Sequence, residues 1–266
     1  MTDTPHTSPA SAPAEDPRTA ELRERLEGVR RRIREATAAA GRTDEPELVV
    51  VTKTHPAEDV LRLAGLGVAD VGENRDQEAR PKAAAVAEAL GASGPRWHFV
   101  GQLQTNKAKH VVRYAAAVHS VDRAELVDAL SRAVTVRRER TPETALPDLD
   151  CLVQVDVDDR PDELRPEGIG PRGGAAPTDV ETLADRIVQA PGLRLRGLMC
   201  VAPRGVDPEQ AFGRLAELSA RLRRAHPGAG ALSMGMSADL EAAVRAGATH
   251  VRIGSDILGA RGAAVG

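Results

Sequence analysis

The sequence predicts a single (β/α)8 TIM barrel, an α/β fold, with one additional helix at its amino-terminal side. Eight short β-rich runs alternate with segments whose apolar residues recur at helical spacing. Strict alternation of strand and helix predicts a parallel sheet, and eight repeats predict that the sheet closes on itself. The length of 266 residues fits, because barrels of this kind typically have about 250 residues. A doubly wound open sheet is the main alternative.

The elements follow one another with little interruption. An amphipathic helix over 19–40 comes first, with Leu22, Leu26, Val29 and Ile33 on one face and mainly Arg and Glu elsewhere. The predicted strands are apolar and rich in β-branched residues, and they cover 48–52, 68–71, 98–101, 116–120, 151–157, 195–200, 231–234 and 250–253. The predicted helices between them cover 57–64, 74–90, 105–112, 123–138, 178–189, 209–225 and 238–246, and a last helical turn begins near Asp256.

Three segments fall outside this repeating pattern. Residues 1–17 are rich in Thr, Ser, Pro and Ala and lack the apolar core of a signal peptide, which predicts a flexible tail before a barrel domain at 18–266. Two stretches rich in Pro and Gly, 141–148 and 158–177, predict long surface loops. The second loop could lie over a ligand site.

Composition argues against several classes of partner. The formal net charge of -3 leaves no basic footprint for nucleic acid or for an anionic membrane surface. No run of about 18 apolar residues could span a bilayer. Cys151 and Cys200 lie in apolar runs without a C-x-x-C partner, so we expect buried thiols in a reducing, cytoplasmic compartment. We also expect a monomer rather than an obligate oligomer.

Lys53 is the first candidate site residue, because it closes the apolar run 48–52. In a barrel this position lies at the carboxyl end of a strand, where ligand sites gather. An amine desolvated there would have a lowered pKa and would be a usable nucleophile. Lysines of that kind form Schiff bases with carbonyl compounds. The alternative is an ordinary lysine at a strand end that reaches into water.

Two turns near the carboxyl terminus predict an anion site. Ser237 follows the seventh predicted strand and reads as a helix cap, with Gly235 before it to let the backbone approach a ligand. Gly254 and Ser255 follow the eighth strand in the same way. Barrel enzymes frequently bind phosphate after these two strands, on the amides at helix starts. We expect the nearby acidic residues, such as Asp239, to stabilise the helix starts without touching the anion.

Arg252 is a second charged residue inside a predicted strand. It could point outward, with its stem packed beneath a helix. If it points into the mouth of the barrel instead, a permanently protonated guanidinium would face the ring of a ligand held by the two phosphate turns.

Six segments of the chain together form a specific set of motifs. They are Val-Thr-Lys-Thr-His-Pro (51–56), Val-Gly-Glu-Asn-Arg-Asp-Gln-Glu-Ala (71–79), Trp-His-Phe-Val-Gly-Gln-Leu-Gln-Thr-Asn-Lys (97–107), Leu-Arg-Gly-Leu-Met (195–199), Leu-Ser-Met-Gly-Met-Ser-Ala-Asp-Leu-Glu-Ala-Ala (232–243) and Val-Arg-Ile-Gly-Ser-Asp-Ile-Leu-Gly-Ala-Arg (251–261). From about residue 20 to 262 the chain resembles the pyridoxal phosphate homeostasis protein family (YggS/PROSC type).

The resemblance implies a barrel like the amino-terminal domain of alanine racemase, with pyridoxal 5′-phosphate joined to Lys53 as an internal aldimine. It places the phosphate group at Ser237, Gly254 and Ser255, with Met236 beside them.

The same resemblance matches Arg252 to an arginine that faces the pyridine nitrogen, and Asn74 to a residue lining the cofactor pocket. His98 and Gln102 are further candidates for that lining. In the second loop, Arg172 stands where many relatives carry a lysine; it preserves the charge but cannot form a Schiff base.

The function implied is a carrier that buffers the cofactor in the cell and delivers it to apo-enzymes, without strong catalytic turnover. Arginine disfavours protonation of the pyridine nitrogen, so the ring would be a poor electron sink. A racemase also needs an acid or base on each face of the substrate carbon. Lys53 supplies one at most, and Tyr114, the only tyrosine, is expected away from the strand ends. A pyridoxal-phosphate-dependent amino-acid racemase or lyase remains one alternative, and a phosphosugar-binding barrel another.

Overall fold

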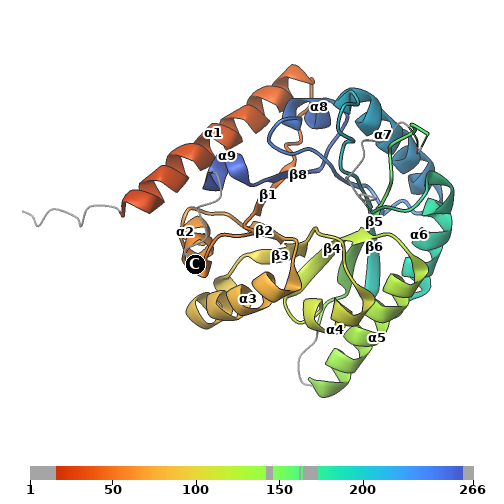
Figure 1. The fold of residues 1–266 in the computed structure, drawn as a ribbon, viewed down its shortest axis with the longest axis horizontal. Coiled ribbons are helices and arrows are strands. Elements are labelled where there is room, and N and C mark those ends of the chain that lie inside the picture. Colours follow the sequence, from red (N-terminus) through yellow and green to blue (C-terminus); the bar gives the residue numbers. More distant parts are fainter. Residues whose placement is uncertain (1–15, 142–145, 162, 164–172, 260–266) are drawn as a thin grey trace, which may run out of the picture.

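The chain folds into a closed barrel of eight parallel strands, shown in Figure 1. The computed structural model describes residues 16–141, 146–161, 163 and 173–259. Each strand pairs with the next along the chain, and β8 pairs back with β1. This closure confirms the predicted fold class and excludes the open sheet. The strands are β1 (Glu47–Val51), β2 (Asp70–Glu73), β3 (Arg96–Phe99), β4 (Ala115–Val121), β5 (Leu149–Gln154), β6 (Leu193–Met199), β7 (Ala231–Ser233) and β8 (His250–Ile253).

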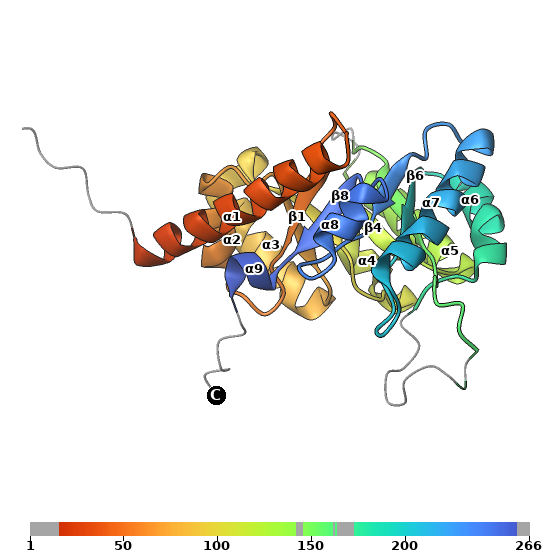
Figure 2. The same cartoon turned by 90° about the horizontal axis from the view of Figure 1, so that it is seen from above.

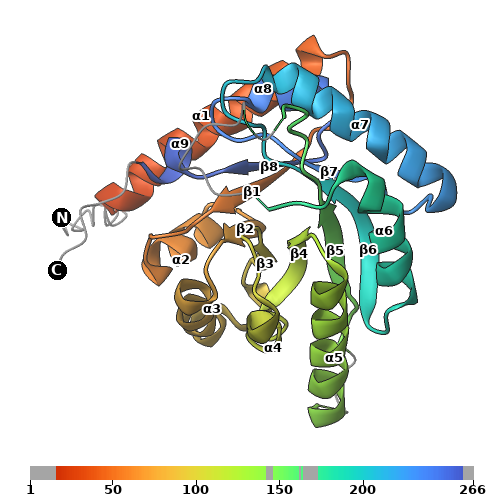
Figure 3. The same ribbon diagram turned by 45° about the vertical axis from the view of Figure 1, so that its right-hand side comes forward.

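Helices surround the strands on the outside, as Figure 3 shows. Buried apolar residues between the strands and these helices form the main core, which extends round the barrel. The helices are α1 (Pro17–Ala39), α2 (Ala57–Gly65), α3 (Asp76–Leu90), α4 (Ala108–Val111), α5 (Ala124–Arg140), α6 (Val180–Gln189), α7 (Pro208–Ala225), α8 (Leu240–Arg245) and α9 (Ser255–Leu258).

The additional helix α1 packs along the outside of the barrel against α2, α8 and α9, as Figure 2 shows. Its predicted apolar face is buried, including Leu22, Leu26 and Ile33. The helix begins at Pro17, two residues earlier than predicted. Asp16 caps it by accepting a hydrogen bond from the Thr19 amide at 3.3 Å, and proline suits the first helical position. Residues 1–15 lie outside the described part of the chain.

Several predicted boundaries are wrong by a few residues. The second strand runs over Asp70–Glu73 rather than 68–71, because Val68 packs into the core from the end of the preceding turn. The predicted helix 105–112 is divided into a 3-10 turn, Thr105–Lys107, and the short helix α4. The eighth helix begins at Leu240 rather than 238.

The barrel interior is partly polar, which is unusual because interiors of this fold are dominated by branched apolar residues. Side chains alternate between the two faces of each strand. On the side away from the helices lie Leu152, Met199 and Ala231, which form a small separate apolar cluster. The strands also carry buried polar residues, which are Asp70, His98, His119, Ser233 and Arg252.

Within the described residues, no helix combines the length and the apolar character that crossing a bilayer requires.

Candidate functional site

A cavity of about 710 Å³ opens at the carboxyl ends of the strands. This is within the range of about 300–1,000 Å³ typical of small-molecule sites. All the candidate cofactor-binding residues line it, although they come from four separate parts of the chain. They are Lys53, Asn74, Met236, Ser237, Arg252, Gly254 and Ser255.

Lys53 follows β1 by two residues and is exposed at the mouth of the cavity. The desolvation of its amine that the sequence suggested is therefore absent in this structure. Its neighbours fix the turn that carries it. Thr52 is buried and donates a hydrogen bond from Oγ1 to Glu73 Oε1 at 2.7 Å, and its carbonyl accepts one from Lys82 Nζ at 2.8 Å.

Thr54, on the other side of Lys53, has a strained backbone. Its φ is +66°, a left-handed value that β-branched residues rarely adopt. The Thr54 amide donates to Glu78 Oε2 at 3.1 Å, which helps to hold this conformation. Strain of this kind costs about 1–3 kcal/mol and gathers at ligand sites. A strained residue thus lies directly after Lys53 at the mouth of the cavity.

The two serine turns meet on one side of the cavity. Ser237 Oγ lies 3.3 Å from Ser255 Oγ, although the residues are 18 apart in the sequence. Within the described part of the chain, no acceptor is found for the backbone N–H groups of Ser237, Ala238, Gly254 and Ser255. Two hydroxyls and these amides can together donate to a single anion.

Two details of the predicted anion site are wrong. Ser237 does not cap α8, because that helix begins three residues later and the Asp239 carboxylate instead accepts a hydrogen bond from the Met236 amide. Gly235 does not line the cavity. It is glycine because its φ is +92° and an added Cβ would lie 2.5 Å from the Cβ of Ala243.

Arg252 points into the barrel, so the alternative of an outward guanidinium is wrong. Its side chain is only 5% exposed and lines the cavity. NH1 donates to Ser233 Oγ and NH2 to the Cys200 carbonyl oxygen, both at 2.7 Å. Burial lowers the pKa of Arg252, and both of these acceptors are uncharged.

The two weaker candidates behave differently. Gln102 lines the cavity beside Asn74. Asn74 is held close to this strand end, since a Cβ on Gly101 would lie 2.2 Å from the Asn74 carbonyl oxygen. His98 does not reach the cavity; it is buried in the barrel interior and bonded to other side chains.

The end of the second predicted loop contacts a residue that lines the cavity. Gln154 lines the cavity, and its Nε2 donates to the Gly173 carbonyl oxygen at 2.9 Å. Ala175 pairs with Val155 as an isolated parallel bridge. Arg172 lies outside the described residues.

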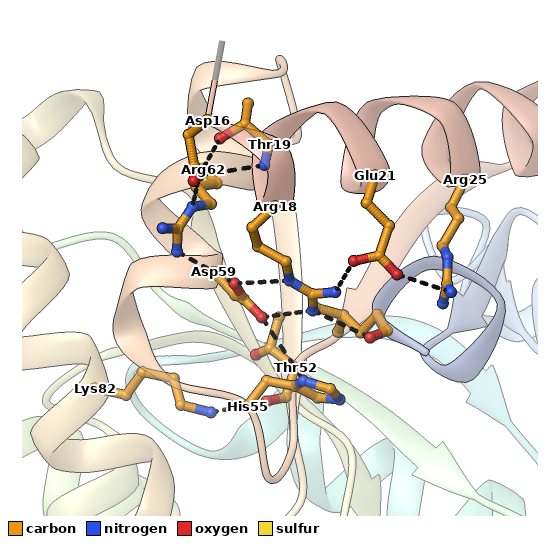
Figure 4. Close-up of polar contacts among 11 residues, drawn as sticks. Asp16, Arg18, Thr19, Glu21, Arg25, Thr52, His55, Asp59, Arg62 and Lys82 are labelled. Carbon is orange, nitrogen blue, oxygen red and sulfur yellow. Dashed lines mark hydrogen bonds and ion pairs between the residues drawn. The ribbon is translucent and has the colours of Figure 1, made fainter. Parts of the chain in front are cut away.

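His55 is a site residue that the sequence reading missed. It lines the cavity two positions after Lys53, and its ring Nδ1 lies 3.7 Å from Asp59 Oδ2 (Figure 4). Burial lowers the pKa of His55. The position of His55 just after the first predicted strand was the signal in the sequence that could have identified it. Besides the Lys53 amine, the cavity thus contains a titratable imidazole.

Asp59 connects this corner of the cavity to α1, as Figure 4 shows. Arg18 donates from Nε and NH2 to the two oxygens of Asp59, at 3.3 and 2.7 Å. The same guanidinium also donates to the Leu258 carbonyl oxygen at 3.1 Å. The additional helix therefore braces both the turn after β1 and the end of α9.

Two histidines of the barrel, the buried His119 and the partly buried His250, make stability depend on pH. Burial holds the pKa of His119 well below its ordinary value and also lowers that of His250. In the unfolded chain both rings gain a proton near pH 6.5. The folded protein then binds fewer protons than the unfolded chain, so the free energy of unfolding falls as the pH drops below about 6.5. The loss is at most about 1.4 kcal/mol per pH unit for each ring.

Urea unfolding between about pH 7.5 and pH 5.5 measures this slope. In the variant His119→Gln, whose amide does not titrate, we expect the slope to be smaller. A free energy of unfolding that stays constant over this range would contradict the assignment of neutral buried rings.

Known proteins resemble this chain over most of its length. The family described as alanine racemase, N-terminal domain, matches residues 25–262. The pyridoxal phosphate homeostasis protein of Mycobacterium tuberculosis is 41% identical over 256 residues, which cover 92% of this chain and 94% of the relative. The protein of the same description from Corynebacterium glutamicum is 41% identical over 214 residues, covering 80% and 90%.

A solved structure of PipY from Synechococcus elongatus, with pyridoxal phosphate bound, has a TM-score of 0.71 and 28% sequence identity. The match covers 89% of this chain and 99% of PipY. The eight strands, the strand ends that form the cavity and the additional helix from residue 25 onward fall within the residues matched by the family.

Proposed function

We propose that this chain, which belongs to the pyridoxal phosphate homeostasis protein family and has its alanine racemase N-terminal domain, binds pyridoxal 5′-phosphate and acts as an intracellular carrier of it. One observation carries the proposal. The sequence contains four lysines, at 53, 82, 107 and 109. Only Lys53 lines the cavity, and it does so together with the serine turns and Arg252.

The residues of the cavity fit the chemical groups of this cofactor. Lys53 offers an amine to the aldehyde, and Ser237, Gly254 and Ser255 offer donors to the phosphate. Arg252 offers N–H groups to the pyridine nitrogen. Among the described residues that line the cavity there is no Asp or Glu. An anionic ligand therefore meets two cations and no opposing carboxylate.

This arrangement supports binding more than catalysis. When bound, the cofactor supplies an electron-withdrawing ring, whose strength in that role depends on protonation of its nitrogen. Arg252 can donate a hydrogen bond but cannot accept one, so it favours the unprotonated nitrogen. The Lys53 amine would bind the aldehyde reversibly, and the anion donors would set the affinity.

Borohydride reduction tests the proposal. The purified protein is mixed with pyridoxal phosphate, reduced, digested and examined by mass spectrometry. We expect one equivalent of label, on the peptide that carries Lys53. A protein that stays colourless with added cofactor and takes up no label would instead support a phosphosugar-binding barrel, and label on another lysine would contradict the assignment of Lys53.

A second candidate function, an amino-acid racemase or lyase, is favoured by His55, which brings a possible base into the cavity. The cofactor-loaded protein is incubated with a panel of amino acids in deuterated water. For a carrier we expect exchange at the α-carbon no faster than with free cofactor. Exchange at enzyme-like rates, lost in His55→Gln, would establish the catalytic alternative.

The remaining parts of the proposal concern where and how the carrier acts. We propose a cytoplasmic monomer that delivers the cofactor to apo-enzymes. The two cysteines support a reducing compartment, because Cys151 and Cys200 are buried and unpaired and burial raises the pKa of both thiols. Transfer of the cofactor to a purified apo-enzyme, compared with release into buffer, measures delivery.

A further inference from the structure

A chain of side-chain hydrogen bonds crosses the barrel interior beneath the cavity. It begins at Arg252, whose NH1 lies 2.7 Å from Ser233 Oγ. Ser233 Oγ lies 2.8 Å from His119 Nδ1, and His119 Nε2 lies 2.8 Å from His98 Nδ1. His98 Nε2 lies 2.8 Å from Asp70 Oδ1, where the chain ends. The five residues come from β8, β7, β4, β3 and β2.

The two end groups determine which atom donates in every bond. Arg252 can only donate and the Asp70 carboxylate can only accept. His98 therefore carries a proton on Nε2, and with a neutral ring its Nδ1 must accept from His119. The ring of His119 then accepts at Nδ1 from the Ser233 hydroxyl. With both rings neutral, this is the single arrangement that satisfies all four bonds.

The alternative arrangement leaves a buried group unsatisfied. If His98 carried two protons, the bonds toward Ser233 would reverse and the serine oxygen would accept from both Arg252 and His119. The Ser233 hydroxyl is fully buried, and no other acceptor for it is found in the described part of the chain. An unsatisfied buried hydroxyl costs about 1–3 kcal/mol. Burial also keeps the pKa of His119 well below its ordinary value.

The hydrogen-bond series ends at the Asp70 carboxylate, which also forms an ion pair with Arg96. Burial alone would raise the pKa of Asp70, but hydrogen bonds from His98 and Arg96 hold it below its ordinary value. Arg96 donates to both carboxylate oxygens, at 2.8 and 2.9 Å. The charge of the buried Arg252 is thus linked through four hydrogen bonds to a carboxylate on β2, the strand on the other side of β1. The neutral groups between them polarise one another.

We infer that Ser233, His119, His98 and Asp70 are positioning residues for Arg252, which hold its guanidinium in the cavity as a hydrogen-bond donor. The inference rests on the proposed function only in assigning the ligand that Arg252 meets. This series of hydrogen bonds meets two requirements that conflict with each other. A buried arginine needs acceptors, but a carboxylate beside it in the cavity would repel an anionic ligand. Uncharged acceptors beside the guanidinium, and a carboxylate that does not line the cavity, avoid that conflict.

The tautomers of the two histidines give a test that needs no cofactor. Nitrogen-15 NMR of the ring nitrogens, in the full chain near pH 7, reports which nitrogen carries the proton. We expect both rings to be neutral with the proton on Nε2. The variants His98→Gln and His119→Gln assign the signals. A proton on Nδ1 of either ring, or an imidazolium, would overturn the inference.

Two serine variants test the effect on the ligand. Ser233→Ala removes the side-chain acceptor of Arg252 and leaves the Cys200 carbonyl oxygen. We expect the dissociation constant of pyridoxal phosphate to rise about tenfold, whereas Ser233→Thr keeps the hydroxyl and should stay within about twofold. Ser120→Ala is the matched control, because Ser120, on β4, is likewise a buried serine and its Oγ has no hydrogen-bond partner among the described residues.

The outcomes separate this inference from the proposed function. If the wild-type protein takes up cofactor on Lys53 but Ser233→Ala binds it as tightly as Ser120→Ala does, the positioning role is wrong and the carrier function stands. Equal weakening in Ser233→Ala and Ser120→Ala would also overturn it, as a general effect of disturbing the barrel. If the wild-type protein binds no cofactor, the proposed function fails. The histidine tautomers still decide whether the series of hydrogen bonds from Arg252 to Asp70 exists.

Discussion

Replacing Lys53 with alanine is expected to abolish the visible absorbance band of bound pyridoxal phosphate. The reason is that no other described residue of the cavity has a primary amine. Lys82 is buried and bonded to Glu73, and Lys109 lies on α4 away from the cavity lining. The phosphate donors are untouched by the change. We therefore expect weak, noncovalent binding to remain, with a dissociation constant raised at least about tenfold, which is about 1.4 kcal/mol.

Absorbance titration and equilibrium dialysis measure the two effects separately. Lys109→Ala is the matched control and should leave both unchanged, because this lysine is exposed and outside the cavity. Lys53→Arg keeps the positive charge but has no amine that can form a Schiff base. It should therefore lose the visible absorbance band but retain more noncovalent affinity for the cofactor than Lys53→Ala does. A full-strength band in Lys53→Ala would mean that another amine, such as Lys107, holds the aldehyde.

Most of the candidate site could be predicted from the sequence because its residues, apart from Arg252 within β8, follow strands. Lys53 comes after β1 and Ser255 after β8, and β1 and β8 are neighbours in the closed barrel. Once the strand count indicated closure, the carboxyl ends of these strands had to meet at one face. The serines at 237 and 255, separated by 18 residues, are brought within hydrogen-bonding distance for the same reason.

The polar interior could not be predicted in the same way. Parallel strands of a barrel are buried on both faces, so the sequence pattern does not show which face a given residue occupies. His98 is therefore only a candidate for the pocket lining in the sequence, and the structure places it in the series of hydrogen bonds behind the pocket. The partners Asp70 and His119 lie in different strands, and their bonds depend on register between strands, which periodicity within one strand cannot specify.

The side-chain contacts that support the turn after β1 could not be predicted from the sequence either. Thr52 appeared there only as the last residue of an apolar run. In the structure it joins Lys53 to a buried ion pair between Glu73 of β2 and Lys82 of α3. A lysine in the middle of a helix normally faces solvent, so the pattern of α3 alone gave no reason to place Lys82 inside.

Removing Lys82 should be the most damaging of the changes considered for stability. The side chains of Lys82 and Glu73 are 7% and 0% exposed. Lys82→Met would leave the Glu73 carboxylate buried without its cation and the Thr52 carbonyl without its donor. Breaking one side of a buried pair typically costs about 3–5 kcal/mol. Urea unfolding near pH 7 measures this loss, and we expect the turn that presents Lys53 to loosen with it.

The double variant Lys82→Met/Glu73→Gln distinguishes a lost charge pair from a packing defect. It removes the unpaired charge while Thr52 Oγ1 can still donate to the amide oxygen at 73, so at least half of the lost free energy should return. The exposed pair Arg31 and Glu35 of α1 provides the control, since both side chains are more than half exposed. Arg31→Met should therefore change the free energy of unfolding by less than about 0.5 kcal/mol. If Lys82→Met costs no more than Arg31→Met, water reaches Glu73 and the pair does not support the Lys53 turn.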